Sequence, residues 1–231
     1  MSDDLATTML PATSPPTGRL SPRARVLLSC GAVAGPLYVL GGLAEATTRR
    51  GFDLAHDDLS LLSNGPLGWI HITLFLLTGF LVILGAVGMA EALRGPRTTK
   101  APAFVGLFGA GLIGAGIFVA DPMGGFPPGT PLGRPVHVSL HGTGHLLTAA
   151  VGFMGLLMAC GLFARHFSRS HEHGLAGYSA FTGLAFFAAF VGIASGSTAA
   201  PVVIGFWIGV ILVFTWLSVL CVRLRRGTVR N

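Results

Sequence analysis

Residues 121–145 read DPMGGFPPGTPLGRPVHVSLHGTGH and join two long apolar segments of the chain. The preceding segment ends on Asp121, a loop rich in Gly and Pro follows, and the next segment opens with His137, His141 and His145. In an α-helix, an i, i+4, i+8 spacing puts three side chains within roughly 80° of one face. Because ionisable groups at membrane depth usually face a bundle interior or a wet cavity, this stretch predicts the functional site.

The composition of the whole chain is that of an integral membrane protein. Of the 231 residues, 52% are hydrophobic and 10% are charged, whereas soluble domains carry about 25% charged residues. The mean hydropathy is +0.71. The formal charge of +6 comes from short basic clusters between apolar runs, which indicates membrane topology and excludes a nucleic-acid-binding surface. Cys30, Cys160 and Cys221 all lie in apolar segments and predict buried thiols.

Six apolar stretches predict an all-α, polytopic membrane protein with six transmembrane helices in one bundle. About 20 apolar residues cross the bilayer core as a helix, and backbone groups in lipid must be hydrogen-bonded within the segment. The expected spans are residues 26–46, 69–92, 101–120, 136–163, 175–195 and 201–222. They form a transmembrane domain over residues 25–226, between a disordered Ser/Thr/Pro-rich tail (1–24) and a short C-terminal tail (227–231).

The basic residues set the expected orientation. Of the 15 Lys and Arg residues, only Arg49, Arg50 and Arg134 lie in the loops after the first and third spans. The positive-inside rule therefore predicts that both termini are cytoplasmic, in a multi-pass protein of the plasma membrane. The histidines and acids of the long loops then gather at the outer face, beside the lipid bilayer.

The histidines and Asp121 are candidate metal ligands. Imidazoles at i, i+4 bind one zinc ion in helical sites, and Asp121 would join His137, His141 and His145 across the short loop. His71, at the start of the second span, would be a further ligand or a general base, so Asp121 and His71 are the catalytic candidates. Zinc or another divalent ion with an open position would activate a water molecule for hydrolysis.

The same residues also have structural interpretations. The histidines would instead form hydrogen bonds between helices, lie at the membrane interface, or handle a proton or ligand. Asp121-Pro122 is also typical of a helix end. Small residues on the face of His145, among them Thr148 and Gly152, predict close helix packing or a cavity wall.

Two other segments carry structural predictions. The glycine-rich run 106–116 lies inside a span, so it indicates close helix packing and not a dinucleotide-binding loop. Residues 57–64 (DDLSLLSN) predict either a solvated surface run or a short helix lying on the membrane and capped by an acid. In a functional interpretation, Asp57 and Asp58 would bind a cation, or Ser60 would assist at a site below.

Several of these motifs together resemble a known family. The pieces are RGFD at 50–53, LS at 59–60, GW at 68–69, GAGIFVADP at 114–122, PPGT at 127–130 and His137. This pattern resembles the bacterial and archaeal membrane proteins catalogued as domain of unknown function 998, over nearly all of residues 25–225. The resemblance implies a six-span bundle. It maps the family's Asp-Pro to Asp121-Pro122 and its following histidine to His137 or His141.

Three functions follow from these observations. The first is a metal-assisted hydrolase that acts on a lipid or amphiphile at the outer face. A mechanistic analogy supports it, because transmembrane hydrolases of the alkaline ceramidase and adiponectin-receptor kind hold zinc with Asp and three His, although with seven spans and a different spacing. The second is a proton- or cation-coupled carrier, and the third is a non-enzymatic membrane component whose outer loops bind a partner.

Overall fold

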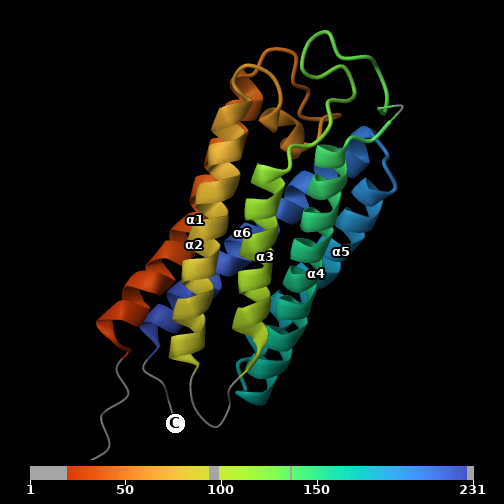
Figure 1. Cartoon of the computed structure of the whole chain (residues 1–231). Helices are drawn as coiled ribbons and strands as arrows, with labels where there is room; N and C mark the ends of the chain where they lie inside the picture. Colours follow the sequence, from red (N-terminus) through yellow and green to blue (C-terminus); the bar gives the residue numbers. More distant parts are fainter. Residues whose placement is uncertain (1–19, 94–98, 136, 228–231) are drawn as a thin grey trace, which may run out of the picture.

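The computed structural model describes residues 20–93, 99–135 and 137–227, and its regular elements are helices (Figure 1). Of the two expected tails, most of residues 1–24 and 227–231 lies outside the described residues, and Pro22–Ala24 already belong to the first helix. The elements are α1 (Pro22–Thr48), η1 (Leu59–Ser63, a 3-10 helix), α2 (Gly68–Ala92), α3 (Ala101–Ile117), α4 (Leu140–Arg169), α5 (His173–Ala194) and α6 (Ala200–Arg226).

The six α-helices form a closed ring. Each helix packs against the next one in the chain, and α1 packs against α6. In Figure 1, α1 begins and α6 ends at one end of the bundle, while the α1–α2 and α3–α4 loops lie together at the opposite end. We call this opposite end the loop end. The expected all-α polytopic bundle is therefore confirmed.

Five of the helices, all except α3, are long and apolar enough to cross a membrane. The exception has 17 residues, and a helix of that length measures about 26 Å. The third span was expected to run to Ala120, but the helix ends at Ile117 and Phe118 is already extended. Pro122 contributes to this, because it has no backbone N–H to donate to the carbonyl oxygen of Phe118, which accepts from His145 on α4 instead.

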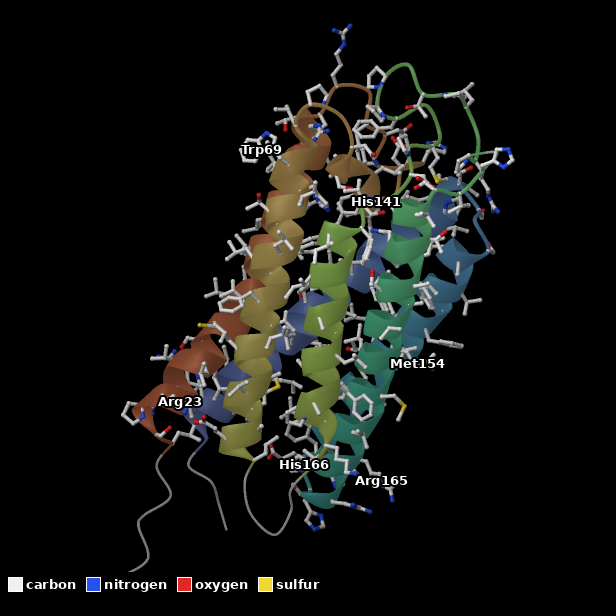
Figure 2. The ribbon with its side chains drawn as sticks, in the orientation of Figure 1. Arg23, Trp69, His141, Met154, Arg165 and His166 are labelled. Carbon is white, nitrogen blue, oxygen red and sulfur yellow. The ribbon has the colours of Figure 1, made fainter. Side chains whose placement is uncertain are left out.

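The distribution of charge along the bundle matches the expected topology. Arg23 and Arg165 lie at the end that carries the termini, whereas Trp69 and His141 lie at the loop end (Figure 2). The last turn of α6 adds Arg223, Arg225 and Arg226 to the basic end. That the basic end is cytoplasmic stays a prediction from the positive-inside rule.

Glycines allow α3 to approach both of its neighbours closely. A Cβ atom added to Gly111 would lie 2.5 Å from the Cα of Gly152 on α4. A Cβ atom added to Gly79 on α2 would lie 2.6 Å from the carbonyl oxygen of Gly109 on α3. No real Cβ atom tolerates such distances, so the glycine run of α3 serves close helix packing, as predicted.

Candidate functional site

The first turn of α4 is fixed by Asp121. The Asp121 carboxylate accepts hydrogen bonds from the backbone N–H of Ser139 at 2.8 Å and from the Ser139 hydroxyl at 2.5 Å. The Ser139 hydroxyl in turn accepts from the N–H of Gly142 at 2.9 Å, which makes it the N-cap of the helix. The serine cap and the carboxylate together anchor the helix to the end of α3.

This cap corrects the expected start of the fourth span. The span was predicted from residue 136, with His137, His141 and His145 on one helical face. The helix instead begins at Leu140, so His137 precedes it and is exposed. The reason is that Ser139, with its extended backbone, satisfies the free N–H groups of the first turn.

The two remaining histidines have different surroundings. His141 is exposed at the loop end (Figure 2), and its ring lies 6.1 Å from that of Phe118. His145 is buried, and its Nδ1 lies 2.8 Å from the carbonyl oxygen of Phe118 and 3.2 Å from that of Ala115. Since carbonyl oxygens only accept, Nδ1 carries the proton, and in the neutral ring Nε2 is an acceptor. This is the predicted hydrogen bond between helices.

The predicted metal ligands are therefore not assembled. In the described part of the chain, no group of three or more His, Cys, Asp or Glu side chains could hold a metal ion. Asp121 binds Ser139, and His145 turns its Nδ1 to backbone carbonyls. The geometry gives no support to a zinc site made of His137, His141, His145 and Asp121.

His71, the other catalytic candidate, belongs to a buried ionic network that we call the Glu45 network (Glu45, Arg49 and His71). The His71 Nδ1 lies 2.8 Å from Glu45 Oε2, and Arg49 Nη1 lies 3.2 Å from Glu45 Oε1. His71 is fully buried, and its Nε2 has no hydrogen-bond partner among the described residues. The i, i+4 spacing of Glu45 and Arg49 was the sequence signal for this pair.

Arg49 extends this network into the first loop. It donates hydrogen bonds to the carbonyl oxygens of Leu62 at 3.0 Å and Asn64 at 2.5 Å. The Asn64 side chain then donates to the carbonyl oxygen of Ala120 at 3.1 Å. One arginine thus holds the loop between α1 and α2 against the rest of the bundle.

The expected short helix in residues 57–64 is present as η1, but the segment is buried, which corrects its expected position. Leu61 and Leu62 are 2% and 0% exposed, so the segment is neither a solvated run nor a helix lying on the membrane. Leu59 and Leu61 of this segment line the cavity inside the ring of helices, so the segment covers the loop end with apolar side chains. Asp58 precedes η1 but makes no side-chain hydrogen bond to it, so the predicted acidic cap is also wrong.

A cavity of about 530 Å³ lies beneath η1, inside the ring. Its volume falls in the range of about 300–1,000 Å³ that is usual for small-molecule sites. The deeper walls come from α3, α4, α5 and α6 and are strongly aromatic; they include Phe108, Phe153, Phe186, Phe190 and Phe206. The cavity is therefore a mainly apolar chamber of the size of a small-molecule site.

The cavity reaches the outside of the bundle between α4 and α5. Leu146 and Ala150 on α4 and Ala194 on α5 line the cavity and are also exposed on the surface. Leu146 is 62% exposed.

The polar groups of the cavity gather at its loop end. They include Asp58, Asp121, Arg134 and His145. Two of them are engaged, because Asp121 binds Ser139 and Arg134 donates to the carbonyl oxygens of Ser195 at 2.7 Å and Gly196 at 3.2 Å. The cavity thus combines a polar end with an apolar depth.

Asp58 differs from these engaged groups. Its carboxylate makes no hydrogen bond or ion pair with any residue that the structure describes. Burial, together with the charge of neighbouring Asp57, raises the pKa of Asp58 to about 6. From the sequence, Asp58 was expected to cap a short helix or, together with Asp57, to bind a cation; its burial depends on how the loop packs.

The fold and the cavity define a multi-pass membrane protein with an internal chamber that is polar at one end. The chain belongs to the family described as "Protein of unknown function (DUF998)", whose model matches residues 32–223. This confirms the family resemblance seen in the sequence. Searches of curated proteins and of solved structures gave no significant match.

The role of Asp121 in holding α4 gives a direct prediction. In Asp121→Ala, Ser139 keeps its cap but loses two hydrogen bonds to a carboxylate, and stability should fall by about 1.5–3 kcal/mol, the usual range for a hydrogen bond to a charged group. Thermal unfolding of the detergent-purified protein measures the change. Asp53→Ala removes an exposed acid from the loop between α1 and α2 and is the control. A metal-binding role would instead be indicated if added zinc stabilised the natural protein but not Asp121→Ala.

Proposed function

We propose that this protein is an amphiphile-binding protein of the plasma membrane, which holds a single apolar chain in the cavity and a polar headgroup at its loop end. The observation that carries the proposal is the form of the cavity, with aromatic walls in its depth and Asp58, Arg134 and His145 at one end. Ligand sites in proteins have this character, mostly apolar with a few convergent polar groups.

The side opening supports a membrane-borne ligand over a water-soluble one. Leu146 and Ala150 lie both on the cavity wall and on the lipid-facing surface of α4. A chain that enters there exchanges lipid surroundings for protein walls and keeps its headgroup near the membrane surface. The orientation predicted from the basic residues assigns that surface to the outer leaflet.

The cavity favours binding over the other functions considered. An ion or proton pathway needs polar groups through the whole membrane, but the deeper walls of the cavity are phenylalanine rings. Metal-assisted hydrolysis needs a ligand set that the described residues do not assemble. Should the bound amphiphile also be cleaved, the acceptor Nε2 of His145 is the group that is placed to take a proton.

Filling the cavity tests this function. Ala150→Trp places a large side chain at the side opening, whereas Ala188→Trp makes the same change on α5 at an exposed position outside the cavity lining. We expect native mass spectrometry of the natural protein and of Ala188→Trp to show one retained amphiphile. The retained fraction should fall at least fivefold in Ala150→Trp. Equal retention by all three proteins would contradict the proposal.

A further inference from the structure

We propose that the headgroup held at the loop end of the cavity is a protonated amine, with Asp58 as its counter-ion. This inference rests on the proposed function, because it assumes that an amphiphile occupies the cavity. It goes further by assigning the chemical class of the ligand, a long-chain amine.

The first argument is the balance of free donors and acceptors at the loop end of the cavity. The Asp121 carboxylate and two nitrogens of Arg134 already have protein partners. Nη1 of Arg134 is a donor without a partner among the described residues, and the acceptors left for a ligand are the Asp58 carboxylate and Nε2 of neutral His145. A headgroup that donates hydrogen bonds complements them, and an ammonium group donates three.

The second argument is the free-energy cost of leaving a partly buried carboxylate without an opposite charge. Asp58 immediately precedes the buried segment η1 and lines both the cavity and a second, small pocket, which Gly196, Ser197 and Thr198 also line. A partly buried charge without a partner is costly, and an opposite charge is the usual compensation in proteins. No basic side chain of the described residues forms an ion pair with Asp58, so we assign the compensating positive charge to the ligand.

The third argument is the sign of the surrounding charges. The charged and titratable groups that share a lining with Asp58 are His56 and Asp57 in the small pocket, and Asp121, Arg134 and His145 in the cavity. With the histidines neutral, three carboxylates face one guanidinium, which is itself bound to backbone carbonyls. A phosphate or carboxylate headgroup would be repelled there, whereas an ammonium group is attracted.

The charge state of Asp58 adds a pH dependence. Because burial and Asp57 raise the pKa of Asp58 to about 6, the carboxylate is ionised at pH 8 and about nine-tenths protonated at pH 5. An aliphatic amine stays protonated over this whole range, since its pKa is near that of Lys, about 10.4. Amine binding should therefore weaken about tenfold between pH 8 and pH 5.

The experiment compares three probes with the same chain in the natural protein reconstituted in zwitterionic lipid nanodiscs: dodecylamine, dodecanol and dodecyl phosphate. Each probe displaces a photoreactive dodecyl alcohol from the cavity. We expect dodecylamine to compete at least tenfold better than dodecanol at pH 8, dodecyl phosphate to compete worst, and the advantage of the amine to fall about tenfold at pH 5.

Two substitutions separate the headgroup assignment from the binding function. Asp58→Asn keeps the shape of the side chain and should abolish the advantage of dodecylamine over dodecanol together with its pH dependence. Asp53→Asn, an exposed acid on the same loop, should change neither. If dodecylamine kept its advantage in Asp58→Asn, or never had one, the headgroup assignment would be overturned. If Ala150→Trp bound the photoreactive alcohol as well as the natural protein, the binding function itself would fail.

Discussion

Arg49→Ala is expected to cost about 3–5 kcal/mol of stability, the range for breaking a buried ion pair by removing one partner. The side chains of Arg49 and Glu45 are both only 7% exposed, so the remaining carboxylate would stay buried with His71 as its sole ionisable partner. The same change removes the hydrogen bonds to the carbonyl oxygens of Leu62 and Asn64. It should therefore also release the loop that covers the cavity.

Thermal and SDS-induced unfolding of the purified protein measure this effect. Arg50→Ala is the matched control, because the neighbouring arginine is exposed. Adding Glu45→Gln to Arg49→Ala should recover part of the loss, since it removes the unpaired charge. If Arg49→Ala unfolded at the same temperature as Arg50→Ala, the buried network would not be holding the loop.

The second large effect is expected for Gly111→Leu, at the closest approach of α3 and α4. A side chain there meets the backbone of Gly152, with only 2.5 Å between the added Cβ and its Cα. Backbone cannot yield as a flexible side chain does, so the helices must separate, and overpacking of this kind costs about 1–3 kcal/mol or more. Because both glycines line the cavity, its walls should also shift.

Gly161→Leu is the control for this substitution. Gly161 is a helical glycine of α4 with no atom within 4 Å of an added Cβ, so leucine fits there without a clash. We expect Gly111→Leu to lower the unfolding temperature and the amphiphile retention, while Gly161→Leu leaves both near the natural values. Similar losses in the two variants would mean that the close contact between α3 and α4 does not determine the stability or the amphiphile retention.

The bundle could be predicted from the sequence because its signals are local. Each long apolar segment indicates one span by itself, and the glycine run 106–116 indicates close packing even when the partner helix is unknown. The sequence also predicted that the face carrying His145 and Gly152 packs against another helix or lines a cavity, and it does both.

The candidate site was harder to predict because it depends on contacts between distant segments. The interaction of Asp121 with Ser139 shifts the start of α4 and removes His137 from the helix. The pattern of residues 57–64 is compatible with a helix on the membrane surface and also with a buried loop segment. Only the packing of this segment against the ring of helices distinguishes the two positions. The cavity has no sequence signature, since all six helices contribute side chains to its lining.

The central claim, that the cavity inside the ring of helices holds an amphiphile, is tested most directly by mapping the adducts of a chain-end photoreactive dodecylamine. We predict adducts on the deep aromatic walls, at Phe153 and Phe190, which unlabelled dodecylamine suppresses. Adducts confined to lipid-facing positions such as Leu147 and Val151, and unchanged by competition, would contradict it.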